Sequence, residues 1–259
     1  AMNQQPGRQG LPRCTARPYA PSAMLSTLAE GGLKYRERER GFSRSFHSYF
    51  QRMDLVERIS ACRLCAARFA ATATHHAPRP VAWFRPGASI LIVGQAPGMR
   101  VHLAGRPFAD RSGDRLREWM GVDSAVFYDR RRIAVVPMAF CFPGYDAKGS
   151  DLPPPPLCAQ TWRREVLETL QPRLTLLVGG HAQRWHLGAR NGVTQAVTQW
   201  RDHAPAIFPL PHPSWRNTGW LKRNPWFQAE LVPALRLAVA RTLESHDDAS
   251  GFAVPDPLP

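Results

Sequence analysis

SILIVGQAPG, residues 89–98, is the stretch that decides the fold of this chain. It is a short apolar run of strand-forming residues that stops at a Gly/Pro turn. Strands of parallel sheets, which are buried on both faces, have this composition. Ligands of such sheets bind outside the carboxyl ends of the strands, so we expect the chemistry at residues 94–98. A plain strand–turn–helix junction has the same pattern, and the rest of the chain has to decide between the two.

Three further apolar runs are typical of strands, and helix-forming segments lie between them. The strands are expected at 133–136, 174–178 and 206–210. The helices are expected from Asp54, which caps the first one, at 113–120 with Ser112 as the cap, and at 159–170, 181–187 and 225–243. Strands that alternate with helices predict a parallel sheet covered on both faces. The fold class is therefore α/β, a three-layer α/β/α sandwich with a central, mainly parallel sheet of about four strands.

The two ends of the chain differ from this domain, which we place at residues 53–244. Residues 1–52 are basic and poor in apolar repeats, and residues 245–259 are acidic and contain proline. Both compositions predict disorder. An organelle presequence, or a natural start at Met53, is an alternative for the first segment.

The charge balance points to a polyanionic partner. The chain carries 34 basic and 20 acidic residues, a formal net charge of +14. This excess favours nucleic acid first and an anionic membrane second.

Five cysteines without a secretory signal argue against a disulfide scaffold and indicate a reducing, cytoplasmic compartment. No GK[ST] motif follows the glycines, so Walker-type nucleotide binding is not supported. The paired H-x-E and P-C-x-x-C motifs of zinc deaminases are also missing from the sequence, so deaminase chemistry is not supported either. No run of residues is long and apolar enough to cross a membrane. We expect the protein to be a monomer.

Four of the cysteines have the spacing of a metal site. Cys62 and Cys65 form a C-x2-C pair near the first predicted helix, and Cys141 and Cys158 bracket the loop after the second predicted strand. Two such pairs are typical of a tetrathiolate site that holds either structural zinc or an iron–sulfur cluster. Spacing alone favours zinc, and four separate buried cysteines are the alternative. Cys14 lies in the basic front segment and is expected to be free.

The chain resembles the uracil-DNA glycosylase superfamily, most closely its iron–sulfur branches, families 4 and 5. The resemblance covers about residues 54–243 and rests on four blocks in the same order. These are the C-x2-C pair, GQAPG with GRPFADRSG behind it, FCFPG (140–144) with Cys158, and HPS (212–214). It implies that Cys62, Cys65, Cys141 and Cys158 hold a structural 4Fe–4S cluster, which replaces the preference for zinc. It also implies a monofunctional hydrolase that removes uracil or a related deaminated base from DNA without a divalent metal.

The same resemblance assigns roles around the opening stretch. Phe108 matches the aromatic residue that stacks on the flipped base, and His212 matches the histidine that donates to the base carbonyl. Gly94, Gln95, Ala96 and Ser214 are expected to contact the substrate. A core phenylalanine and a histidine that satisfies its own loop are the alternatives. His102 is either a phosphate or substrate contact or a solvated loop residue.

Departures from the family pattern move the catalytic acid. Family 4 has Glu where this chain has Gln95, and the best-known branch has Asp where it has Ala96. Family 5 lacks an acid there too and uses an Asp just before Ser-Gly, a position that Asp110 fits. We therefore expect Asp110 to orient or deprotonate the attacking water, with a helix cap as the alternative. Pro137 occupies the place of the base-reading Asn in family 4, so deaminated purines or a broader range of bases remain open.

After HPS the family carries a loop that wedges into the gap left by the flipped base. Aromatic and apolar side chains mixed with cations suit that task. The expected DNA contacts are Trp215, Arg216, Trp220, Leu221, Lys222 and Arg223. The alternative is that the tryptophans pack on the last helix. The competing function is a nucleic-acid-binding protein of the same fold without catalysis, and a redox sensor is a weaker third.

Overall fold

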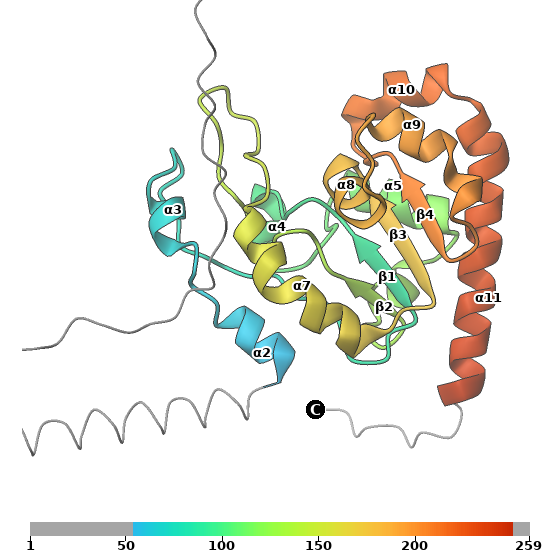
Figure 1. The fold of residues 1–259 in the computed structure, drawn as a ribbon, viewed down its shortest axis with the longest axis horizontal. Coiled ribbons are helices and arrows are strands. Elements are labelled where there is room, and N and C mark those ends of the chain that lie inside the picture. Colours follow the sequence, from blue (N-terminus) through green and yellow to red (C-terminus); the bar gives the residue numbers. More distant parts are fainter. Residues whose placement is uncertain (1–53, 251–259) are drawn as a thin grey trace, which may run out of the picture. The chain divides into compact units, whose positions relative to one another are not determined.

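The computed structural model describes residues 54–250, without the side chains of residues 248–250. The predicted front segment, residues 1–52, lies outside the described residues. A single sheet of four parallel strands runs through this part of the chain in the order β2-β1-β3-β4 (Figure 1). The strands are β1 (Ile90–Val93), β2 (Ile133–Val135), β3 (Leu174–Val178) and β4 (Ile207–Leu210). The predicted fold class is confirmed.

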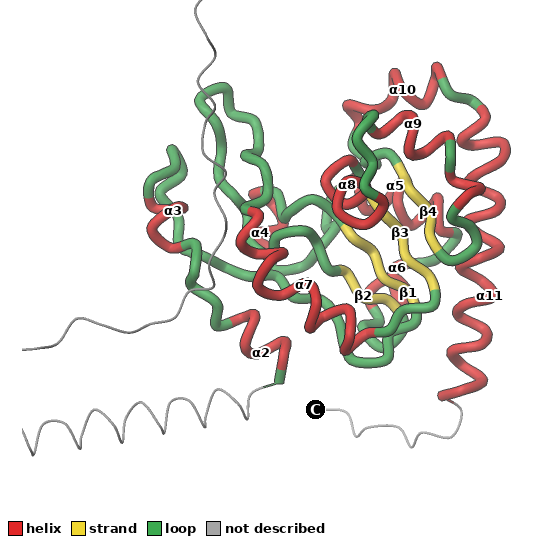
Figure 2. Tube along the Cα trace, viewed as in Figure 1, coloured by secondary structure: helices red, strands yellow, loops and turns green. Residues whose placement is uncertain are grey.

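Helices and short helical turns fill the connections between the strands (Figure 2). In chain order the helices are α2 (Leu55–Ser60), α3 (Ala66–Ala70), α4 (Met99–Ala104), α5 (Arg111–Met120), α6 (Ser124–Tyr128), α7 (Pro156–Leu170), α8 (Gly180–Leu187), α9 (Val193–Thr198), η1 (Trp200–Asp202), η2 (Trp215–Asn217), α10 (Thr218–Arg223), η3 (Phe227–Leu231) and α11 (Val232–Ser250). None of the helices within residues 54–250 is long and apolar enough to cross a membrane.

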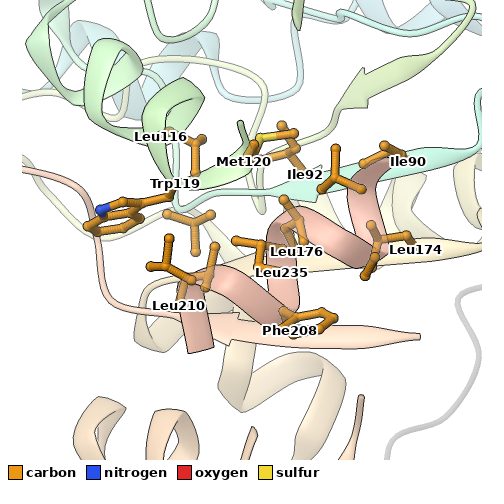
Figure 3. Packing of buried hydrophobic residues seen from close by; sticks show 14 of the residues in the cluster. Ile90, Ile92, Leu116, Trp119, Met120, Leu174, Leu176, Phe208, Leu210 and Leu235 are labelled. Carbon is orange, nitrogen blue, oxygen red and sulfur yellow. The ribbon is translucent and has the colours of Figure 1, made fainter. Parts of the chain in front are cut away.

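Alternate residues of the strands point to opposite faces of the sheet and build two cores. Ile90 and Ile92 belong to one core together with side chains of α5, α6, α9, η3 and α11. Figure 3 shows the side chains that α5 and α11 contribute beside those of the strands. Leu91 and Val93 belong to the other, together with side chains of α2, α7 and α8. All four side chains of β1 are fully buried. The continuous apolar run in the sequence is therefore explained by burial on both faces.

Several helix boundaries differ from the prediction. The first helix begins at its predicted cap, because Glu57 N–H donates to Asp54 Oδ1 at 2.7 Å and Asp54 N–H donates back to Glu57 Oε2 at 3.1 Å. It ends at Ser60, so Cys62 and Cys65 do not share a helical face with its apolar residues. The predicted last helix is divided, because η3 has a π-helical turn and α11 continues to Ser250, past the predicted boundary at 244. The five short helices α3, α4, α6, α9 and α10 were not predicted, since five or six residues are too few for a helical period to stand out.

The predicted cap of α5 was wrong. The helix begins at Arg111, and Asp110 rather than Ser112 is its N-cap residue. Asp110 has the extended backbone of a cap residue, φ −140° and ψ −177°, and its Oδ1 accepts hydrogen bonds from Ser112 N–H at 3.0 Å and Gly113 N–H at 3.2 Å. The helix therefore starts two residues earlier than expected, at the aspartate that was also the predicted catalytic acid.

Gly113 is required by contact rather than by backbone angle. A Cβ atom at this position would lie 1.9 Å from the carbonyl oxygen of Phe108. A glycine-to-alanine change inside a helix usually stabilises it by about 0.5–1 kcal/mol. We expect Gly113→Ala to destabilise the protein instead, by about 1–3 kcal/mol, because backbone has to move.

The matched control for this change is Gly219→Ala in α10, where the nearest atom is the end of the flexible Arg223 side chain at 3.6 Å. Urea unfolding of both variants against the parent chain measures the difference. Equal stability of the two variants would contradict the contact between Gly113 and Phe108.

Candidate active site

A cavity of about 380 Å³ opens at the carboxyl edge of the sheet. The loop after β1, the start of α5 and the loop after β4 all contribute to its wall. Every residue that the sequence predicts to handle the base or the water lines it. These residues are Gly94, Gln95, Ala96, Phe108, Asp110, His212 and Ser214.

The backbone of the loop after β1 is held by the chain that leaves β2. Gly94 C=O accepts a hydrogen bond from Met138 N–H at 2.9 Å, and Gln95 C=O accepts one from Ala139 N–H at 3.2 Å. These bonds extend the β1–β2 pairing beyond the strands and bring Pro137 into the cavity wall. Within residues 54–250, the N–H groups of Gln95 and Ala96 donate no hydrogen bond. The loop thus offers backbone donors where relatives place an acid.

Phe108 lines the same cavity from the loop before α5. Its ring tip, Cζ, lies 3.8 Å from the position that a Cβ on Gly94 would take. The ring also meets the Phe127 ring edge-on, with centroids 6.1 Å apart. Phe108 is only partly buried, so one part of the side chain packs on the core and the rest faces the cavity.

Asp110 caps α5 and also lines the cavity, so its position is compatible with both roles that the sequence left open. One carboxylate oxygen, Oδ1, caps α5, and within residues 54–250 the other oxygen makes no hydrogen bond. Asp110 and His212 line the same cavity, and the negative charge of Asp110 acts to raise the pKa of the His212 imidazole. A carboxylate that caps with one oxygen keeps the second for a ligand or water, so the cap does not exclude catalysis.

His212 is held as a neutral hydrogen-bond donor. Burial lowers its pKa, and the charge of Asp110 only partly opposes this effect. Ser214 N–H donates to His212 Nδ1 at 3.2 Å, which assigns the imidazole proton to Nε2. Asn217 Nδ2 donates to His212 C=O at 2.7 Å, and Arg115 Nη1 donates to the carbonyls of Pro213 and Ser214 at 3.3 and 3.2 Å. The HPS segment is thereby tied to α5 through Arg115.

The family model described as the uracil DNA glycosylase superfamily matches residues 81–236. The chain belongs to this superfamily. The matched range contains all four strands and every residue of the cavity wall. A uracil-DNA glycosylase-like function, with DNA as the substrate, is therefore its general activity.

Met99, Arg100 and Asp151 are among the further side chains that line the glycosylase cavity without having been predicted to do so. Met99 and Arg100 come from α4, and Asp151 comes from the loop between Cys141 and Cys158. Asp151 Oδ2 lies 3.7 Å from the position of a Cβ on Gly98. Burial raises the pKa of Asp151, and the charge of Arg216 acts in the opposite direction. The sequence signal that could have identified Asp151 as a cavity residue was the presence of an acid in the loop between Cys141 and Cys158.

The predicted DNA-contacting loop of the glycosylase divides into exposed and packed residues. Trp215 is 74% exposed, Arg216 lines the cavity mouth, and Lys222 and Arg223 are exposed. Trp220 and Leu221 instead pack against the core, and at the surface Trp220 Nε1 donates to Thr194 Oγ1 at 2.8 Å. Its ring lies 5.7 Å from that of Phe227. The alternative of a packed tryptophan thus describes Trp220, and Trp215 is left as the exposed aromatic. Contact of these residues with DNA stays a prediction.

His102 does not line the cavity. It lies partly buried on α4, with its ring 5.4 Å from that of His76 and 6.0 Å from that of Phe142. Burial lowers its pKa, and the charges of His76 and Arg79 add to this effect. The side chain packs between elements rather than standing in solvent.

The four cysteines that the sequence paired surround a second, small cavity of about 20 Å³. All four thiols are free, and apolar side chains form most of the remaining wall. Burial raises the pKa of Cys141 to about 12 and that of Cys158 to about 11, and neighbouring thiols add to both shifts. In the described part of the chain, no three His, Cys, Asp or Glu groups stand close enough to hold one metal ion. Cys141 and Cys158 lie inside the range matched by the family, whereas Cys62 and Cys65 precede it.

The assigned tautomer of His212 gives a prediction that needs no activity assay. Because the pKa of His212 is lowered, its ring is expected to be neutral at pH 7, with the proton on Nε2. Long-range ¹⁵N–¹H NMR spectra of the imidazole nitrogens measure this directly, and His212→Gln identifies the signal by its loss. An imidazolium at pH 7, or a proton on Nδ1, would contradict the hydrogen bond from Ser214.

Proposed function

We propose that the protein hydrolyses the N-glycosidic bond of uracil or a related deaminated base in DNA and leaves an abasic site. One observation carries the proposal: an aromatic ring, a carboxylate, a neutral imidazole and backbone N–H groups line one cavity at the sheet edge. Excision requires the base to leave the helix and enter a pocket where its edge is read. The net charge of +14 supports binding to the phosphate backbone.

The leaving base is stabilised by hydrogen-bond donors. The base stacks on Phe108, and its carbonyl receives the Nε2–H of His212. The N–H groups of Gln95 and Ala96 lie in the same wall and are available to a second acceptor. Fixed donors that meet the charge as it develops lower the barrier, because they need no reorganisation during the reaction.

Asp110 handles the water. The oxygen that does not cap α5 accepts a proton from the attacking water, whose oxygen bonds to C1′ as the C1′–N bond breaks. The electron pair of that bond goes to the base, which leaves as an anion stabilised by His212. General-base assistance of this kind contributes about 10²–10⁴-fold to a rate.

The range of bases is broader than uracil alone. Pro137 lies in the cavity wall at the place where family 4 has a base-reading Asn, and it has neither a side-chain amide nor a backbone N–H to offer. Val81 and Val135 line the same cavity and are apolar. A side-chain amide rejects a wrong base strictly, because that base would leave the buried amide without a hydrogen-bond partner. A wall that selects bases only by backbone contacts and shape discriminates less strictly.

A panel of oligonucleotides tests the activity. The full chain is incubated in EDTA with DNA that contains uracil, hypoxanthine or xanthine, and alkali then cleaves abasic sites. We expect strand breakage with uracil and with at least one deaminated purine. If no substrate in the panel yields an abasic site, the enzymatic proposal fails. Salt-dependent DNA binding without base release would then support the non-catalytic alternative, which the absence of an acid at Gln95 and Ala96 favours.

A matched pair of variants separates the cap of Asp110 from its chemistry. Asp123 caps α6 in the same way, since its Oδ1 accepts from Val126 N–H at 2.8 Å, but it does not line the cavity. Asparagine caps helices about as well as aspartate, so both Asp110→Asn and Asp123→Asn should keep the parent melting temperature. We expect only Asp110→Asn to lose activity, by about 10²–10⁴-fold in kcat. Equal activity of the two variants would leave Asp110 as a cap alone.

The protein belongs to the iron–sulfur branch of the superfamily in our proposal, with Cys62, Cys65, Cys141 and Cys158 as ligands of a 4Fe–4S cluster. The donor set fits, because four soft thiols face one apolar cavity and thiolates are the ligands that such clusters take. A cluster held by these four cysteines would be structural, since Cys62 and Cys65 beside α3, Cys141 in the loop after β2 and Cys158 at the start of α7 would then be joined through it.

Iron content and colour test the cluster without an activity assay. Protein purified without oxygen is expected to be brown, to absorb at roughly 400 nm and to contain about four irons per chain. Cys62→Ala and Cys141→Ala should lose both the colour and the iron. Cys14→Ala is the control, since Cys14 lies outside the described residues and outside the proposed ligand set. A colourless protein that contains zinc would contradict the assignment to this branch.

A further inference from the structure

Phe108 has a backbone conformation that its side chain does not favour. Its φ is +50°, in the left-handed region where a bulky residue is rare. Such a conformation persists only when the surrounding structure imposes it, and it is concentrated at functional sites. The ring that faces the cavity is therefore held in place by other groups.

Two groups fix the carbonyl of Phe108 from different elements. The hydroxyl of Tyr128, the last residue of α6, donates a hydrogen bond to Phe108 C=O at 3.0 Å. The backbone of Gly113 in α5 fits against the same oxygen so closely that a Cβ there would lie 1.9 Å from it. The backbone of Gly113 prevents the Phe108 carbonyl from moving toward α5, whereas the Tyr128 hydroxyl holds it by a hydrogen bond.

Tyr128 is itself held from several sides. Arg117 Nη1 donates a hydrogen bond to the Tyr128 hydroxyl at 3.3 Å, and the hydroxyl in turn donates its own hydrogen bond to Phe108 C=O. The guanidinium of Arg106 lies over the Tyr128 ring at 4.3 Å, and the rings of Trp83 and Phe127 meet it edge-on at 5.6 and 5.1 Å. A phenol in this setting has little freedom to turn away.

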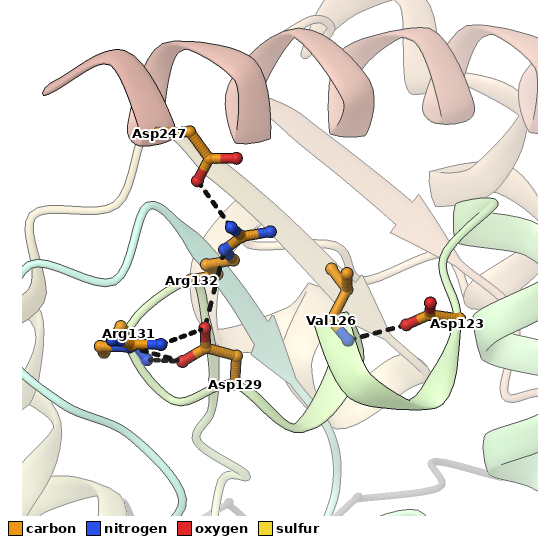
Figure 4. A network of polar contacts seen from close by, with 6 residues as sticks. All are labelled: Asp123, Val126, Asp129, Arg131, Arg132 and Asp247. Carbon is orange, nitrogen blue, oxygen red and sulfur yellow. Dashed lines mark hydrogen bonds and ion pairs between the residues drawn. The ribbon is translucent and has the colours of Figure 1, made fainter. Parts of the chain in front are cut away.

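The chain after Tyr128 is anchored by charge (Figure 4). Asp129 pairs with Arg131 at 3.1 Å and with Arg132 at 3.6 Å, and Arg132 reaches Asp247 on α11 at 3.0 Å. Burial alone would favour the neutral acid, but the hydrogen bonds and charges of these arginines lower the pKa of Asp129. The network fixes the connection between α6 and β2, and with it the position of Tyr128.

We propose that Tyr128 is a positioning residue for base recognition: its hydroxyl keeps Phe108 in the left-handed conformation that presents the ring to the cavity. This inference rests on the proposed function, in which Phe108 stacks on the flipped base. Tyr128 itself does not line the cavity, so it acts through Phe108 and not on the substrate. Without its hydroxyl, Phe108 relaxes toward an ordinary backbone conformation and the stacking face is lost.

Tyr128→Phe tests this with the loss of a single oxygen atom. Stacking is made before and during bond cleavage, so its loss weakens ground state and transition state alike. We expect KM for a uracil oligonucleotide to rise about 3–10-fold with kcat nearly unchanged, the size of effect that one hydrogen bond carries. Asp123→Asn, at the other end of α6, is the control and should change neither constant.

A double-mutant cycle separates positioning from general stability. In the Phe108→Ala background, Tyr128→Phe should have no further effect on KM, because the ring that it positions is gone. The proposal is overturned if Tyr128→Phe retains its full effect in that background, if it lowers kcat alone, or if KM does not change.

A crystal structure of Tyr128→Phe provides a readout that is independent of activity. We expect Phe108 to leave the region near φ +50° or its ring to leave the cavity wall, and an unchanged Phe108 would overturn the proposal. If the parent chain releases no base, the proposed function fails, but this structural comparison still decides whether Tyr128 positions Phe108.

Discussion

The parallel direction of the four strands is the constraint on which the rest of the structure depends. Because all four run the same way, the loops after β1, β2 and β4 emerge at one edge of the sheet. Burial of β1 on both faces fixes its place in the interior of the sheet, between β2 and β3. The GQAPG turn, Pro137 and His212 therefore meet around one cavity although they are far apart in the sequence.

The loops at this edge form few backbone–backbone hydrogen bonds among themselves. Side chains that donate hydrogen bonds to their carbonyl groups hold these loops in place. Arg115 binds the carbonyls of Pro213 and Ser214, and Tyr128 binds that of Phe108. Buried Arg163 on α7 donates to the carbonyls of Val136 at 3.1 Å and Pro137 at 2.6 Å, and burial lowers its pKa to about 10. Since α7 also carries Cys158, Arg163 connects the cysteine cavity to the wall of the cavity at the sheet edge, to which Pro137 belongs.

Asp110 illustrates how far the sequence could go at the site. The motif identified it as an acid beside a helix start, and cap and catalyst were equally compatible with that position. Two potential caps, Asp110 and Ser112, stand two residues apart, and local propensity does not choose between them. The extended backbone of Asp110 and the close contact of Gly113 with Phe108 C=O select the earlier start, which leaves one carboxylate oxygen for the cavity.

The sequence by itself determined the four strands, the α/β class and seven of the residues that line the cavity, because apolar runs and loop motifs are local signals. Only the tertiary structure decided which side chains are available there. It packs Trp220 against Phe227 while Trp215 stays exposed, brings Asp151 to the cavity, and holds Phe108 at a positive φ. These outcomes depend on contacts between distant segments, and no local pattern of residues encodes such contacts.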